Sequence, residues 1–522
     1  MKITFLGHAG FFIETSKTLL IMDAWVSKNG AFDGGWFQYP KNHHMAGFLE
    51  KKLHDNKNEK DVYVYVSHEH KDHFDISFLK SIDKFNFKYV IPSFRRTLLE
   101  DQIRSFSEKE LIICDDNHLI KLNEDEFVKI FTDDSELNRD SAILFTSNGK
   151  KFLNLNDCKI HDRLGLIKKE EGEIDVFAVQ FSGATWHPTC YEYTQSDYEQ
   201  ISKKKKRSKF EATAVAIELV KPKVYIPSAG PACFLDPDLI HINFQQHNIF
   251  PRDTEVIKYL DRRLRKIKPV IYGMFPEDSI EISKDILYKE GPLERIDDDN
   301  FKNYITQYAE EYKDFFKKIK QPIIGHKYSE LKNYIIKEFQ NKLDNFKSRI
   351  KIERPLYFEF IDQTDSLFKI DFQQGKVEEV NDILEEDFYK IKSYSYDIER
   401  IKDRHITWED YSLTFRMKLN REPDVYQVLM QGFLILEIKD LNFFCDKILE
   451  IENRTERITV EVDGCKYRID RFCPHQGADL KHAWFEGKHL VCPRHRWEFD
   501  IENGGDCMVN LSSLNAIPLD ED

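Results

Sequence analysis

The chain has few cysteines and no long hydrophobic segment. Its 522 residues include nine cysteines, which favours a reducing compartment over a framework of disulfide bonds. It contains no apolar run of roughly eighteen residues, the length that spans a membrane, and its N-terminus lacks the pattern of a signal peptide. We therefore expect a cytoplasmic protein that does not associate with a membrane.

The chain also has fewer basic residues than acidic ones. The 77 basic residues are outnumbered by 91 acidic ones, and the resulting net charge of -14 argues against a nucleic-acid-binding protein. One basic run, residues 203–207, departs from this balance. Such a run is usually the solvated face of a helix. The alternative is that it guides phosphate groups or an acidic redox partner toward a cleft.

Four potential metal ligands near the C-terminus form two mixed pairs. Cys473 and His475 are separated by one residue, Cys492 and His495 by two, and 16 residues lie between the pairs. This pattern resembles a Rieske centre, in which two thiolates hold one iron of a 2Fe-2S cluster and two imidazoles hold the other. The alternative is a zinc site, but zinc motifs place the two cysteines together and the two histidines together. We therefore predict a 2Fe-2S cluster.

The residues around these pairs refine the interpretation. Strand-like runs over 457–462 and 466–469, separated by an Asp-Gly pair, predict a hairpin that leads into the first loop. Respiratory Rieske proteins carry an extra cysteine in each loop, but Ala478 and Arg494 lie in those neighbourhoods here. The sequence is therefore similar to the ferredoxin and oxygenase type, with a potential at the low end of the Rieske range.

A second set of ligands follows an apolar strand in the N-terminal quarter. His68, His70, Asp72 and His73 form the motif H-x-H-x-D-H, and the chain opens over residues 2–14 with two apolar strands joined by a glycine-flanked turn. This opening and motif resemble the metallo-β-lactamase fold, an αββα sandwich, and in particular its ascorbate-lactonase-like branch. The resemblance implies that His68 and His70 bind a first metal, and Asp72 and His73 a second.

The remaining ligands of that fold are less regular here. Asp157 ends a predicted strand over 151–157, where the fold places its metal-bridging aspartate. A histidine is expected roughly twenty residues earlier, but Asp133 and Asp134 stand there instead, so a carboxylate is the candidate replacement and Asp134 a tentative ligand. A last histidine should end the strand over 223–227, yet Ser-Ala-Gly follows.

His187 is the candidate for that missing nitrogen. Its alternative role, as a substrate-binding or structural residue, carries equal weight. A ligand set with fewer imidazoles and more carboxylates favours iron or manganese over zinc. Because redox-inert zinc has little use beside a Rieske cluster, we predict one or two irons in the N-terminal domain.

Four stretches are similar to one family that combines both metal centres. Residues 23–25, 31–36, 182–184 and 224–230 resemble segments of the CMP-N-acetylneuraminate hydroxylases. Those of animals carry the Rieske module first, whereas here it is C-terminal. This difference leaves the chemistry intact but bears on the identity of the substrate.

The length predicts about three or four domains. We expect a metallo-β-lactamase-fold catalytic domain over 1–290, a helical or α+β connecting module over 291–448, and an all-β Rieske domain over 449–522. The fold class is therefore multidomain α/β plus β.

The resemblance implies an iron-dependent monooxygenase. Electrons from a ferredoxin, a flavoprotein reductase or a b-type cytochrome would pass through the cluster to iron held by His68, His70, Asp72, His73 and Asp157. Oxygen would be inserted into a C-H bond of a small molecule, for which the family suggests a nucleotide-activated amino sugar, and oxidation at nitrogen is a variant. The alternatives are a metal-dependent hydrolase with a redox-sensing Rieske module, and an electron carrier whose N-terminal fold has lost its metal.

Overall fold

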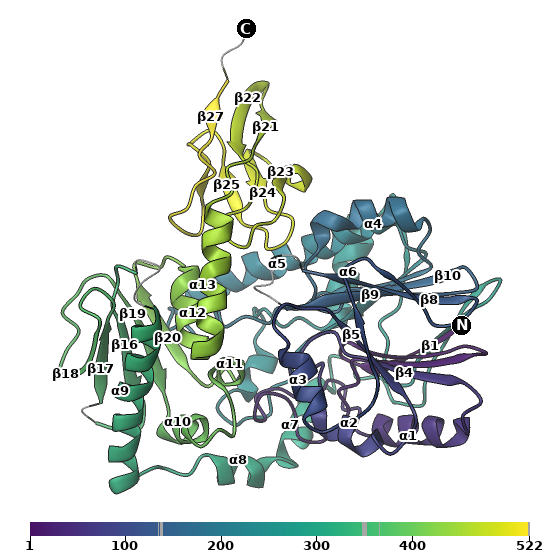
Figure 1. The fold of residues 1–522 in the computed structure, drawn as a ribbon, viewed down its shortest axis with the longest axis horizontal. Helices are drawn as coiled ribbons and strands as arrows, with labels where there is room; N and C mark the ends of the chain where they lie inside the picture. Colours follow the sequence, from purple (N-terminus) through teal and green to yellow (C-terminus); the bar gives the residue numbers. More distant parts are fainter. Residues whose placement is uncertain (134, 136–138, 347–351, 365, 520–522) are drawn as a thin grey trace. The chain divides into compact units, whose positions relative to one another are not determined.

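The computed structural model describes residues 1–522 apart from 134, 136–138, 347–351, 365 and 520–522 (Figure 1). The chain forms two compact units. The first contains Met1–Ala184 and Glu199–Glu310, and the second contains Thr185–Tyr198 and Glu311–Asp522. The second unit thus includes a short segment that interrupts the first in chain order. The three domain boundaries expected from the sequence stay a prediction.

Two sheets make up the centre of the first unit, and each is antiparallel in one half and parallel in the other. The first has the order β15 (Ile286–Lys289), β14 (Ser279–Ile282), β1 (Lys2–Gly7), β2 (Gly10–Glu14), β3 (Thr18–Met22), β4 (Asp61–Tyr65), β5 (Lys88–Pro92), β6 (Leu111–Cys114). The second has the order β13 (Val270–Ile271), β12 (Val224–Ser228), β11 (Val176–Gln180), β10 (Lys150–Asn154), β9 (Ser141–Ser147), β8 (Glu126–Thr132), β7 (Leu119–Lys121).

Helices cover the outer face of both sheets. One cluster of apolar side chains from both sheets, including Phe11, Tyr65 and Ile226, fills the space between them. A second cluster packs α1 (His44–Asn56), α2 (Ile76–Ile82) and α3 (Leu98–Arg104) on the first sheet. A third packs α4 (Leu164–Glu171), α5 (Gln195–Val220) and α6 (Asp253–Arg263) on the second. Because both faces of each sheet are covered, the central strands are largely apolar.

The unit is therefore the αββα sandwich expected from the sequence, and the two opening strands, β1 and β2, lie where they were predicted. A further helix, α7 (Phe301–Glu310), places Tyr304 near Tyr39 and Lys41 of the sandwich. The parallel strands β10, β11 and β12 end side by side, so the residues after them share one edge of the second sheet.

The second unit contains a five-stranded sheet in its α+β part. The sheet has the order β18 (Lys376–Val380), β17 (Leu367–Asp371), β16 (Leu356–Phe360), β19 (Phe388–Ser393), β20 (Lys418–Glu422). Its helices are α8 (Lys313–Ile319), α9 (His326–Phe346), α10 (Ser395–Lys402), α11 (Trp408–Ser412), α12 (Val428–Ile435) and α13 (Ile438–Glu452). Of all the helices in the described part of the chain, none has the length and apolar character needed to cross a membrane.

The C-terminal part of the second unit is all β, drawn in yellow in Figure 1. One small sheet has the order β21 (Arg457–Val462), β22 (Cys465–Asp470), β27 (Ile517–Pro518), and the other has β23 (Trp484–Glu486), β24 (His489–Val491), β25 (Glu498–Asp500), β26 (Asp506–Cys507). The predicted hairpin is present: Asp463 and Gly464 have φ angles of 49° and 85°, as a tight two-residue turn requires. The small apolar core includes Cys473 and Cys492.

Candidate metal centres

The N-terminal site forms in the loop that follows β4. This strand is parallel to both neighbours, so the loop emerges at one edge of the sandwich. The amides of His73 and Phe74 donate to the carbonyl of His70, at 3.0 and 2.7 Å. Asp75 then caps α2 by accepting a hydrogen bond from the Phe78 amide at 3.1 Å. The loop is thus held by a strand before it and a helix after it.

A first group of ligands consists of His68, His70 and Asp140. His68 Nε2 lies 2.9 Å from His70 Nδ1 and 3.7 Å from Asp140 Oδ1. Asp140 is brought there by β9, which begins at the next residue: the Ser141 hydroxyl donates to the Ser67 carbonyl at 2.8 Å. Candidate ligands from both sheets therefore lie close together at this edge of the sandwich.

A second group consists of His8, Asp72, His73 and Asp157. His73 Nε2 lies 3.7 Å from Asp72 Oδ2 and 3.6 Å from Asp157 Oδ1, and His8 Nε2 lies 3.1 Å from Asp72 Oδ2. Potential ligand atoms of His68, His73 and Asp157 also lie within 4.8 Å of one another. Asp157 is thus near histidines of both groups, as its predicted bridging role requires.

Asp23 and Ser67 orient two of these histidines. The Asp23 carboxylate accepts hydrogen bonds from His73 Nδ1 and from the Ser67 amide, both at 2.8 Å. The Ser67 hydroxyl donates to Asp23 and lies 2.9 Å from His68 Nδ1. A proton held on His73 Nδ1 leaves the Nε2 lone pair free toward Asp72 and Asp157, which is how carboxylates prepare histidines for a metal.

The charges of the site suit a cation. Burial, aided by His73 and His70, lowers the pKa of His68 well below its ordinary value, so this ring is neutral, as a ligand must be. Burial alone would raise the pKa of Asp157, but the positive charge that His73 carries when both of its ring nitrogens are protonated outweighs burial and lowers that pKa. Burial, together with the charge of Asp157, raises the pKa of Asp140 to about 6. The carboxylates of Asp140 and Asp157 thus share a site that a metal cation would stabilise.

Two atoms of the site lack partners that a metal would supply. His73 Nε2 and Asp157 Oδ1 are buried and have no hydrogen-bond partner within the described residues, and their separation of 3.6 Å is too long for a hydrogen bond. Two ligands of one metal ion lie about this far apart, given metal-ligand distances near 2.1 Å. The mixed imidazole and carboxylate donors suit iron or manganese. The residues present therefore fit the predicted metal.

A carboxylate lies beside His68 and His70, a few residues beyond the place where the sequence predicted one. Asp140 joins His68 and His70, whereas Asp133 Oδ1 accepts a hydrogen bond from the Ser135 amide at 2.9 Å. Asp134 lies outside the described residues. The remaining carboxylate of the H-x-H-x-D-H segment, Glu69, pairs with the buried Arg139.

Sequence reasoning missed His8. Its carbonyl accepts a hydrogen bond from the Ala229 amide at 2.9 Å, so His8 lies beside the residues that stand where the last histidine of the fold was expected. His8 itself has φ of 52°, in the left-handed region, within the turn between β1 and β2. The one sequence signal was a histidine between small residues in that turn. His8 thus places a ring nitrogen in the second group, and this nitrogen stands in for the histidine that was expected at the end of β12.

His187, the tentative ligand, belongs to the second unit. Its Nε2 lies 2.8 Å from the hydroxyl of Tyr193, which donates to Asp424 at 2.8 Å. Asp424 also accepts a hydrogen bond from Arg421 at 2.6 Å. His187 is therefore part of a polar network of its own unit, and its role as a metal ligand stays a prediction.

The Rieske loops bring the four C-terminal ligands together. The amide of Gly477 donates to the Cys473 carbonyl at 2.8 Å, and that of Arg496 to the Cys492 carbonyl at 3.0 Å, so both loops turn tightly after their cysteines. The rings of His475 and His495 have centroids 4.5 Å apart. Both cysteines are buried and are free thiols, as cluster ligands require.

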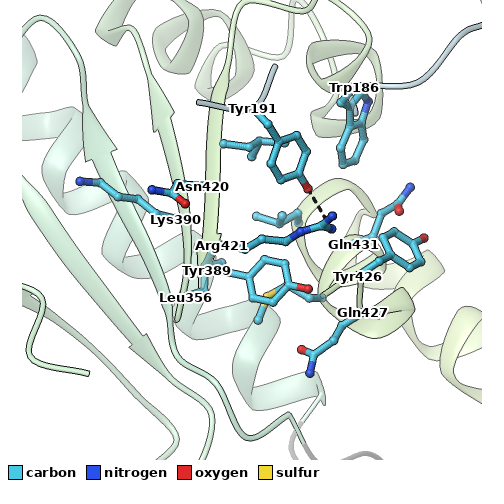
Figure 2. Close-up of a pocket in the computed structure, with 13 residues that line it drawn as sticks. Trp186, Tyr191, Leu356, Tyr389, Lys390, Asn420, Arg421, Tyr426, Gln427 and Gln431 are labelled. Atoms are coloured by element: carbon cyan, nitrogen blue, oxygen red, sulfur yellow. Dashed lines mark hydrogen bonds between the residues drawn. The ribbon is translucent and has the colours of Figure 1, made fainter. Parts of the chain in front are cut away.

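An aromatic contact connects these ligands to a small cavity in the second unit. The Tyr426 ring meets His475 edge-on at 5.9 Å, and His475 stacks on Trp497 at 4.2 Å. Tyr426 also lines a cavity of about 20 Å³, room for one water molecule. Figure 2 shows the Arg421 side chain in this cavity, with its hydrogen bond of 3.4 Å to Tyr191. The polar network of His187 therefore extends to a neighbour of the predicted cluster.

Comparisons with known proteins agree with the C-terminal assignment. A family model described as the Rieske [2Fe-2S] domain matches residues 434–515. A Mycolicibacterium smegmatis protein named as a Rieske 2Fe-2S iron-sulfur protein is 26% identical over 538 aligned positions, and the match covers 97% of this chain and 97% of the relative. A Mycobacterium tuberculosis protein of the same description is 31% identical over 261 residues, and this match spans 48% of each chain.

Solved structures resemble the chain over about half of its length. CmlA, a diiron β-hydroxylase from Streptomyces venezuelae, has a TM-score of 0.37 at 13% identity, covering 55% of this chain and 54% of CmlA. The metallo-β-lactamase-fold protein YhfI from Bacillus subtilis has a TM-score of 0.33 at 11% identity, covering 53% of this chain and 97% of YhfI. The layers, the ligand-bearing loop after β4 and the matched family together confirm the predicted fold class: a metallo-β-lactamase-type sandwich followed by a C-terminal Rieske [2Fe-2S] domain.

Proposed function

We propose that the chain is a Rieske-dependent iron monooxygenase. The observation that carries this proposal is the pair of ligand groups in the sandwich, with orphaned ligand atoms on His73 and Asp157, in one polypeptide with a Rieske domain. A one-electron carrier and a site for a redox-active metal are the two parts that reductive oxygen activation needs. The reaction would consume one O₂, two electrons and two protons, and yield a hydroxylated product and water.

Iron bound by the two groups would supply the oxygen activation, and the cluster would supply the electrons. The protein's own part is to fix the ligands and limit access. His68 and His73 are buried, whereas His70 and Asp157 remain partly exposed. Small molecules would therefore approach from the side of His70 and Asp157.

The identities of the substrate and of the electron donor are also part of this proposal. The resemblance noted in the sequence suggests a nucleotide-activated amino sugar, and oxidation at carbon or at nitrogen would use the same residues. The external donor would be a ferredoxin, a flavoprotein reductase or a b-type cytochrome. A hydrolase with a redox-sensing Rieske module is the competing function, and the metal content separates it from the oxygenase.

An Asp72→Ala variant tests the proposal. The full chain is reduced without oxygen, mixed with a panel of nucleotide sugars, exposed to oxygen and examined by mass spectrometry for a mass increase of one oxygen atom. We expect the variant to keep the Rieske spectrum and to lose the product, because Asp72 lies in the sandwich. Asp61→Ala, at the exposed start of β4, is the matched control. Full product formation by Asp72→Ala would refute the proposed site.

A further inference from the structure

A lysine of helix α5 reaches the same edge of the sandwich as the metal ligands. The helix packs on the outer face of the second sheet through residues such as Phe210, yet Lys209 Nζ donates to Oε1 of Gln180, the last residue of β11. Side chains alternate along a strand, so Gln180 faces the same way as Val176 and Ala178, which lie between the two sheets. Lys209 therefore crosses the carboxyl edge of the sheet from its outer to its inner side.

Ser228 completes the arrangement with a hydroxyl that has no partner. It ends β12 and is the register partner of Gln180 in a parallel pair, which places both side chains on the same face. Its side chain is fully buried, and its Oγ makes no hydrogen bond to any described residue. Leaving a buried hydroxyl without a hydrogen bond costs free energy, so the Ser228 hydroxyl is available to donate a hydrogen bond to a bound ligand.

Backbone hydrogen bonds join Gln180 and Ser228 to the metal ligands on either side. The Gln180 amide donates at 3.3 Å to the carbonyl of Asn156, the residue before Asp157. The residue after Ser228, Ala229, donates at 2.9 Å to the carbonyl of His8. The three side chains of Lys209, Gln180 and Ser228, which we name the Lys209 group, thus lie between Asp157 and His8.

The charge and exposure of Lys209 suit a ligand rather than a permanent ion pair. Burial and the nearby charge of Lys159 lower the pKa of Lys209 to about 7, while Asp157 and Asp140 oppose this change. Its side chain is nevertheless only half-buried by surface exposure, so solvent reaches it. An anion placed beside it would stabilise the charged form.

We propose that the Lys209 group binds an anionic oxygen group of the substrate, a carboxylate or a phosphate, next to the metal ligands. The ammonium of Lys209, the amide of Gln180 and the hydroxyl of Ser228 provide three donors on one side of the site. The inference rests on the proposed function in that it takes the metal ligands as the reaction centre.

Calorimetric titration of the iron-loaded full chain with acetate, and separately with inorganic phosphate, tests this site without turnover. In Lys209→Met we expect the affinity for the bound anion to fall by roughly tenfold to hundredfold, as for a lost hydrogen bond to a charged group. Ser228→Ala should weaken it by roughly threefold to tenfold. Lys203→Met, on the exposed part of the same helix, is the matched control and should bind as the natural chain does.

The two anions distinguish the two candidate groups of the substrate. Binding of acetate indicates that the substrate carries a carboxylate, and binding of phosphate indicates that it carries a phosphate ester. The proposal is overturned if neither anion binds the natural chain, or if Lys209→Met binds as well as Lys203→Met. Loss of N-terminal iron from Lys209→Met would also overturn it, because Lys209 would then be a counter-ion of the ligand carboxylates. If that variant does not fold, Lys209→Arg must retain binding and Ser228→Ala must weaken it. A chain that binds anions in this way yet yields no oxygenated product would refute the monooxygenase and leave the anion site standing.

Discussion

Replacing Asp23 by asparagine should weaken metal binding without touching a metal ligand. The carboxylate of Asp23 accepts hydrogen bonds from His73 Nδ1 and from Ser67. An asparagine keeps the shape but can place its NH₂ group toward Nδ1, which would move the ring proton to Nε2. His73 Nε2, the atom that faces Asp72 and Asp157, would then no longer have a free lone pair.

The expected size of the effect follows from the role of Asp23. Loss of a partner that orients a metal-binding histidine typically costs tenfold to hundredfold in affinity, or about 1.4 to 2.7 kcal/mol. Competition with a chelator, followed by iron analysis, measures this change in Asp23→Asn. The Rieske spectrum should stay the same, because its ligands lie in the other unit.

Asp75→Asn is the matched control. Asp75 is likewise a buried carboxylate, and it accepts hydrogen bonds from the amides of Val26, Ser27 and Phe78 but, among the described residues, none from a histidine. We expect this variant to lose stability while its folded fraction binds iron normally. Equal metal affinity in Asp23→Asn and the natural chain, or equal losses in the two variants, would refute the reasoning.

Three further predictions concern single residues. His8→Asn should lower the iron affinity of the second ligand group by tenfold or more, since even indirect changes cost that much, and unchanged iron content would exclude His8 as a ligand. His495→Cys should alter the Rieske EPR signal and leave the N-terminal iron in place; an unaltered signal would contradict the ligand assignment. Burial lowers the pKa of Lys342 from 10.5 to about 8, so the unfolded chain binds more protons between these values and the stability of the natural chain rises with pH through that window. We therefore compare the free energy of unfolding of Lys342→Met with that of the natural chain, by denaturant unfolding, at pH 7.5 and at pH 10.5. The difference, variant minus natural chain, should be about 3 kcal/mol more favourable to the variant at pH 7.5 than at pH 10.5. An equal difference at both pH values would contradict this.

Local sequence patterns predicted the parts of the site that are close together in the chain. The H-x-H-x-D-H loop and the Rieske pairs each need only one or two loops, so their spacing is visible in the sequence. The strand before Asp157 also lies close to its predicted place, as β10.

Ligands that depend on how distant strands meet could not be placed in this way. Asp140 reaches His68 because β9 begins beside the loop after β4, and His8 faces the end of β12 across more than two hundred residues of sequence. Lys209 reads in the sequence as the continuation of a solvated basic helix, and only the packing of α5 on the second sheet brings it to Gln180. These positions follow from tertiary packing, which overrides the local pattern.

The metal content of the full chain, purified without oxygen from cells supplied with iron, tests the central claim most directly. Two ligand groups in the sandwich and one Rieske cluster predict about four irons per chain, two of them in the cluster, together with a Rieske-type EPR signal after reduction. About three irons would mean that one group holds no metal. Two irons with zinc in the sandwich, or two irons alone, would contradict the account and leave a hydrolase or an electron carrier in its place.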